Sequence, residues 1–188
     1  RMRLRRELQR LTVRGGKSEV VTQAKARLGQ VDLTITNRIE YDGLSWIQIS
    51  LDPKQATQLD GLYLDIPLRE DQATLLHEVT DSIRRVFAGH TPAGTGVVWD
   101  SRRLLNTSGL IGNFKPMYWL GNEDRGLCWF AESDKGWSLD EKQPAIEVIR
   151  QAGQVTLRVH LVNQKFLLDK PRTIAFGLQA TPVKPMPK

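Results

Sequence analysis

The sequence predicts a mainly β protein, a two-layer antiparallel β-sandwich with one short helix. Apolar and polar residues alternate with a period of two in many short segments, which is typical of strands with one buried face. Turn residues such as Tyr41-Asp42-Gly43 and Gln151-Ala152-Gly153-Gln154 separate these segments. Strands and helices do not alternate regularly, which favours an antiparallel sandwich over a parallel α/β sheet.

The alternation places the strands along the chain. We expect strands over Val31–Ile35, Trp46–Leu51, Leu62–Leu68, Val97–Trp99, Leu127–Ala131, Ala145–Arg150, Val155–Leu161 and Ile174–Leu178. Pro67 lacks a backbone N–H, so its strand should lie at a sheet edge or end there.

One segment has helical spacing instead. From Asp71 to Phe87, apolar residues recur at intervals of three and four, with Asp71 as a possible cap and Gly89 as a stop. This spacing predicts a short helix packed across a sheet edge.

The net charge of +6 is concentrated at the start of the chain. Residues 1–30 hold nine Lys and Arg against two Glu, and the remainder is nearly neutral. No basic face interleaved with aromatic residues is visible, so we expect no nucleic-acid partner. No segment approaches the roughly 20 apolar residues of a membrane span, so we expect no membrane partner. The single Cys128 excludes an internal disulfide.

These features predict three regions. Residues 1–30 form a basic leading segment with a first strand, residues 31–180 form the β-sandwich domain, and residues 181–188, rich in Pro and Lys, form a linker to a further domain.

The segment Tyr118–Trp137 is the densest candidate for function, since it contains three Trp, four carboxylates and three Gly. Aromatic faces beside carboxylates suit sugar binding, because the apolar face of a pyranose stacks on an indole while its hydroxyls bind charged acceptors. The candidates for a carbohydrate site or cleft rim are Trp119, Glu123, Asp124, Arg125, Glu132, Asp134 and Trp137. The alternative is a Gly-turned hairpin in which Trp129 faces the core and the charges are solvated or paired.

Other chemistry has weaker support. Glu132 and Asp134 have the same strand parity and could act as a pair of catalytic carboxylates, but any strand offers this spacing. The three His residues lie far apart, so no metal site or cofactor is expected.

Five motifs can be compared with known families: Ile39–Gly43, Leu64–Leu68, Trp119–Asn122, Glu132–Trp137 and Phe176–Pro185. Together they resemble the N-terminal region of large bacterial proteins related to glycoside hydrolase family 123. The resemblance implies a β-sandwich that leads into a catalytic barrel, whose Asp-Glu pair would lie beyond Lys188. No catalytic residue is therefore expected in this chain, and a secreted or periplasmic location is favoured.

Three functions are therefore open. The first is a non-catalytic N-terminal domain that supports or rims the barrel of a glycoside hydrolase, with that barrel as its partner. The second is an autonomous carbohydrate-binding module that exposes aromatic residues on one sheet face, for which Trp46, with Gln48 and Ser50 of the same parity, is a candidate. The third is an enzyme that uses Glu132 and Asp134.

Overall fold

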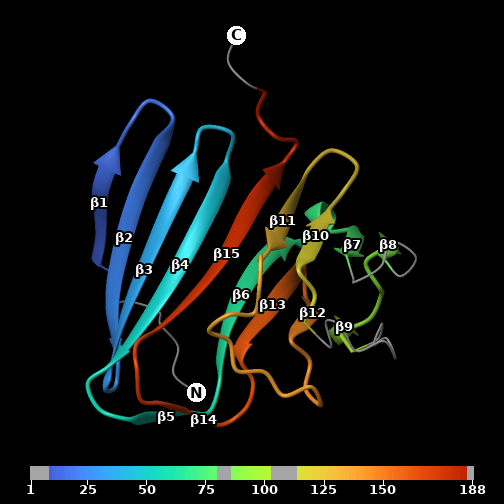
Figure 1. The fold of residues 1–188 in the computed structure, drawn as a ribbon. Coiled ribbons are helices and arrows are strands. Elements are labelled where there is room, and N and C mark those ends of the chain that lie inside the picture. Colours follow the sequence, from blue (N-terminus) through green and yellow to red (C-terminus); the bar gives the residue numbers. More distant parts are fainter. Residues whose placement is uncertain (1–8, 80–85, 103–113, 186–188) are drawn as a thin grey trace.

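The computed structural model describes residues 9–79, 86–102 and 114–185, and these residues form an antiparallel β-sandwich (Figure 1). The predicted fold class is confirmed. Among the described residues, the larger layer has nine strands. Their spatial order is β1 (Gln9–Gly15), β2 (Glu19–Leu28), β3 (Val31–Glu40), β4 (Leu44–Pro53), β15 (Arg172–Thr181), β11 (Gly126–Phe130), β10 (Met117–Gly121), β7 (Leu75–Val79) and β8 (Phe87–His90).

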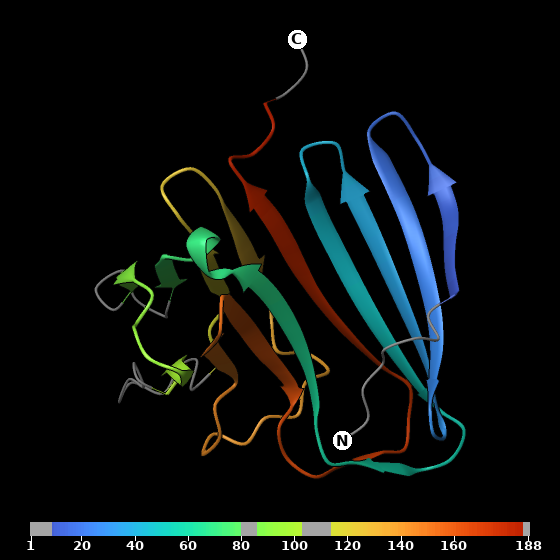
Figure 2. The same ribbon diagram turned by 180° about the vertical axis from the view of Figure 1, so that it is seen from behind.

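The second layer is a smaller sheet, with four strands in the part of the chain that the structure describes. Its order is β6 (Leu62–Arg69), β13 (Gln154–Val162), β12 (Ile146–Gln151) and β9 (Gly96–Asp100). Strand β6 lies at an edge, as Pro67 predicts, and pairs only with β13 among the described strands. A two-stranded ribbon of β14 (Phe166–Leu168) and β5 (Thr57–Leu59) crosses one end of the sandwich (Figures 1 and 2).

The two layers enclose one apolar core. Strands β10, β11 and β15 contribute Tyr118, Trp129 and Phe176, each at most 1% exposed, and the smaller sheet contributes Val, Ile and Leu side chains from β12 and β13. Successive residues of β13 alternate about the sheet, so Val155, Leu157, Val159 and Leu161 all face inward, as the alternation predicts.

The helix predicted for residues 71–87 is wrong over the described part of that segment. Glu70–Gln72 form a single 3-10 turn, Leu75–Val79 form β7, and Phe87 begins β8. Residues 80–85 lie outside the described ranges. In β7, Leu76 and Glu78 are buried and their neighbours are half-buried, which is strand alternation. The buried Glu78 hid this alternation, because an acidic residue is normally counted as solvent-facing.

The leading segment also contributes to the sheet. Strand β2 pairs with β3 along its whole length, from Glu19 opposite Glu40 to Leu28 opposite Val31, and β1 pairs with β2. Within the described residues, no helix is both long and apolar enough to span a membrane.

Candidate functional site

The candidate site lies on the outer face of the nine-stranded sheet, opposite the core. The strand registers align outward-facing residues in two rows that cross the strands. The Trp119 row contains Leu44, Gln179, Cys128, Trp119 and His77, from β4 to β7. The Phe130 row contains Trp46, Gly177, Phe130, Met117 and Val79, from the same strands in the same order.

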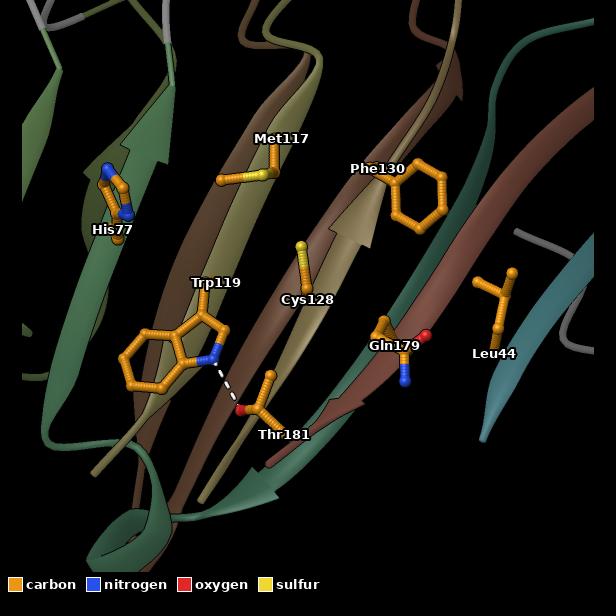
Figure 3. A pocket seen from close by; sticks show the side chains of 8 residues that line it. All are labelled: Leu44, His77, Met117, Trp119, Cys128, Phe130, Gln179 and Thr181. Carbon is orange, nitrogen blue, oxygen red and sulfur yellow. Dashed lines mark hydrogen bonds between the residues drawn. The ribbon is translucent and has the colours of Figure 1, made fainter. Parts of the chain in front are cut away.

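These rows form a shallow, mostly apolar groove. One hollow of about 650 Å³ is lined by Leu44, His77, Met117, Trp119, Cys128, Phe130, Gln179 and Thr181 (Figure 3). A second hollow of about 560 Å³ is lined by Val21, Thr36, Arg38, Leu44, Trp46, Gln48, Phe130 and Glu132. Leu44 and Phe130 line both hollows, so the two adjoin, and together we call them the outer groove.

The indole of Trp119 lies flat against the sheet. It covers Gly121 and Gly126, which pair across β10 and β11, so closely that a Cβ on either glycine would overlap the ring. The indole Nε1–H donates a hydrogen bond to Oγ1 of Thr181 at 2.9 Å (Figure 3). One face of the ring is therefore held by the backbone beneath it, while the side chain remains half-exposed and lines the groove.

A second aromatic surface is formed by Phe130 and Trp46. The Phe130 ring covers Gly177 of β15, where a Cβ would again overlap the ring. The ring centroids of Phe130 and Trp46 are 6.1 Å apart, and the rings are tilted by 41°. The groove thus contains two ring surfaces, each of which depends on glycine in the strands below.

Few polar groups interrupt the surface of the first hollow. The Gln179 amide Nε2 donates to the carbonyl oxygens of Asp42 and Ala180, at 3.4 and 3.1 Å, which leaves its Oε1 as an acceptor in the groove. His77 stands beyond Trp119 on β7, where its ring can offer a donor and an acceptor (Figure 3). These groups suit a ligand with both apolar faces and hydroxyls.

The floor between the two ring surfaces is the thiol of Cys128. Burial raises the pKa of this thiol from 9.0 to about 11, so it stays protonated at neutral pH. Cys128 therefore acts as a small apolar surface and is a weak nucleophile.

The residues predicted from sequence are distributed over several places. Trp119 lines the first hollow and Glu132, an exposed carboxylate, lines the second. Asp134 is also exposed, and both carboxylates follow the end of β11 instead of lying within a strand. Their assumed strand parity is therefore wrong.

The charged residues Glu123, Asp124 and Arg125 are exposed in the turn between β10 and β11. Asn122 builds this turn, since its Oδ1 accepts the backbone N–H of Asp124 and of Arg125, each at 3.0 Å. The turn extends from Gly121 and Gly126, so it lies beyond the Trp119 end of the outer groove.

Trp137 occupies the core. It is 8% exposed and packs against Phe114 and Trp129, with ring centroids 5.2 and 6.0 Å away. Its indole is therefore not available to stack on a ligand in this structure.

The sequence analysis did not single out Leu44, His77, Met117, Phe130, Gln179 or Thr181. Strand parity offered a signal, because Cys128 and Phe130 have the parity opposite to that of the core residue Trp129. Among the described residues, no group of three His, Cys, Asp or Glu side chains is close enough to hold a metal ion.

Comparison of the sequence with models of protein families gave no match. Comparison with curated proteins also gave none. Among solved structures, the chain is similar to a protein of Escherichia coli K12 that is described as a candidate aldose 1-epimerase, with 11% sequence identity and a TM-score of 0.43. That similarity covers 92% of this chain and 68% of the other. At this level of similarity, nothing about the function of the present chain follows.

Proposed function

We propose that this chain is a non-catalytic β-sandwich module that binds carbohydrate in the outer groove. The observation that carries the proposal is the indole of Trp119, which the sheet holds flat over Gly121 and Gly126 while the side chain lines an open groove. A fixed, half-exposed aromatic ring offers a flat apolar surface to the C–H face of a pyranose at little cost in side-chain entropy.

The polar groups of the groove support the same ligand class. The free Oε1 of Gln179 and the ring of His77 lie in the Trp119 row on either side of the indole, where they can bind sugar hydroxyls. A ligand that was only apolar would leave these groups without partners, which is costly.

We further propose that this module is an accessory domain beside a catalytic barrel. This role rests on the motifs that resemble the N-terminal region of proteins related to glycoside hydrolase family 123, and it makes a catalytic barrel of the same protein the partner of this module. The exposed turn of Glu123, Asp124 and Arg125 beyond the Trp119 end of the groove is a surface that such a barrel could contact. Catalysis then belongs to the barrel, and this chain supplies no catalytic residue.

Calorimetric titration of the chain with N-acetylhexosamines, galactosides and plant and host oligosaccharides tests the binding function. We expect saturable binding that is weakened at least tenfold in Trp119→Ala, because an aromatic anchor that is truncated typically costs about 2 kcal/mol. Trp119→Phe, which keeps a stacking ring, should retain most of the affinity.

The matched control is Tyr63→Ala. Tyr63 is also a half-exposed aromatic residue, but it lies in β6 of the other sheet, with the Arg158 guanidinium 4.3 Å from its ring centroid. Its removal should leave binding unchanged. A folded protein that binds no saccharide in the panel, or a Trp119→Ala variant that binds like the parent, would refute the proposal.

A further inference from the structure

We infer that the outer groove binds an extended, neutral oligosaccharide that runs across the strands, with one subsite at Trp119 and a second at Trp46 and Phe130. This inference rests on the proposed carbohydrate binding and specifies the length and charge of the ligand.

The length follows from the strand order. Trp119 is on β10 and Trp46 is on β4, and β11 and β15 lie between them. Three strand spacings of about 4.8 Å therefore separate Trp119 from Trp46 by roughly 14 Å, and Phe130 on β11 lies between them. A single pyranose ring cannot contact both indoles, whereas a chain of sugars can.

The residues between the two subsites are mostly apolar. The two hollows adjoin at Leu44 and Phe130, so a chain that leaves Trp119 passes Cys128 and these two side chains on its way to Trp46. The apolar floor between the subsites favours a ligand that presents ring faces along its length.

The charge follows from the side chains that line the groove. The first hollow is lined by no Lys, Arg, Asp or Glu among the described residues. In the second, the Arg38 guanidinium is already bound to Glu40, with Nη2 and Oε1 2.7 Å apart, and Nε lies 3.9 Å from Glu19. The exposed carboxylate of Glu132 completes this hollow. Uronate or sulfate groups would meet these carboxylates without a free cation among the lining side chains, so a neutral chain is favoured.

Saccharides of increasing length test the inference of two subsites. The probes are the single sugars and the dimers, tetramers and hexamers of the cello, chito and β-galacto series, titrated into the full chain by calorimetry. We expect the hexamer of the bound series to bind at least tenfold more tightly than its monomer. Equal affinity of monomer and hexamer would overturn the two-subsite inference but leave carbohydrate binding at Trp119 intact. Binding of no probe would overturn both.

Substitutions of Trp46 test whether the gain in affinity with ligand length comes from the second subsite. Trp46→Ala should remove most of the gain from dimer to hexamer, with a smaller effect on dimer affinity, and Trp46→Phe should restore the gain. Circular dichroism and thermal melting confirm that both variants fold. A hexamer that binds Trp46→Ala as tightly as the parent would place the second contact elsewhere and overturn the assignment.

Two oligosaccharides that differ in charge test the inference of a neutral ligand. Oligogalacturonate is compared with neutral galacto-oligosaccharide of the same length at low and moderate salt. We expect the anionic chain to bind at least tenfold more weakly, with Glu132→Gln reducing this difference. Tighter binding of the anionic chain would overturn the inference of a neutral ligand.

Discussion

The phenol of Tyr118 donates a hydrogen bond to Oε1 of Glu78 at 3.1 Å, inside the core and between two fully buried side chains. The residues are directly opposite on β10 and β7. Burial raises the pKa of Glu78 from 4.5 to about 7, although the Tyr118 hydroxyl and the nearby charge of the buried Lys115 both act to lower it. The carboxyl therefore binds a proton close to neutral pH.

This buried carboxyl makes stability depend on pH. Between pH 4.5 and 7 the folded state binds more protons than the unfolded state, so the free energy of unfolding falls as the pH rises. Well below pH 4.5 the Glu78 carboxyl is protonated in both states and does not reduce the free energy of unfolding. Above pH 7 its ionisation in the core reduces that free energy by the full amount, about 3 kcal/mol. Urea denaturation at several pH values should show this decline.

Glu78→Gln provides the comparison. The amide still accepts a hydrogen bond from Tyr118 but does not ionise, so the variant should gain stability relative to the parent as the pH rises from 5 to 8. The two proteins differ only at residue 78, so contributions from the rest of the chain cancel in the difference. Parallel stability curves for the two proteins would contradict the prediction.

The hydrogen bond between Trp119 and Thr181 should matter for binding more than for folding. Thr181→Val removes the acceptor of the indole N–H with little change in shape, so the ring should be held less firmly. A typical hydrogen bond contributes about 0.5–1.5 kcal/mol, so we expect saccharide affinity to fall by about two- to tenfold. Titration measures the affinity, and the indole N–H signal of Trp119 in NMR reports the lost bond. An unchanged signal and affinity would show that the bond has no role.

Gly177 should be required for the shape of the second subsite. In Gly177→Ala the new Cβ would overlap the Phe130 ring, which has to swing away from the sheet. We expect hexamer affinity to fall several-fold, whereas stability should change by less than about 1 kcal/mol, because alanine also favours the strand interior over glycine. Thermal melting and calorimetry measure the two effects.

The control for this substitution is Gly61→Ala. Its Cβ would meet only the carbonyl oxygen of Val162 at 3.5 Å, an ordinary contact, and Gly61 does not line the groove. Equal binding by both alanine variants would contradict the assigned role of Gly177.

Cys128 should react slowly with thiol reagents. Its pKa of about 11 instead of 9.0 reduces the thiolate fraction at pH 8 by roughly 100-fold. Alkylation by iodoacetamide, followed by mass spectrometry, should therefore be much slower than for glutathione and should accelerate in denaturant. Rapid alkylation of the folded protein would contradict the burial of this thiol.

Much of the fold could be predicted from the sequence, because apolar and polar residues alternate along the strands of a sandwich. Strand β13 shows this most clearly, since Val155, Leu157 and Val159 face the core and the residues between them are polar. The prediction for the segment of β7 was wrong because the buried position Glu78 carries a carboxyl. Only the pairing with β10 explains why this side chain lies inside.

The candidate site was less predictable. Trp119 was identified from its residue type, but its orientation depends on Thr181, which is 62 positions away in the sequence. Trp137 was selected for the same reason as Trp119, although it packs against Trp129 in the core. Residue type alone does not distinguish a core indole from a groove indole. Strand register sets the face that Trp119 occupies, whereas the path of the loop between β11 and β12 sets the position of Trp137.

Strand β15 pairs on one side with β4 and on the other with β11, so residues 172–181 join the first four strands to the remainder of the nine-stranded sheet. Until β15 is synthesised, β4 and β11 therefore both have an unpaired edge. Exposed strand edges promote association between chains, so the pairing of β15 closes two such edges at once.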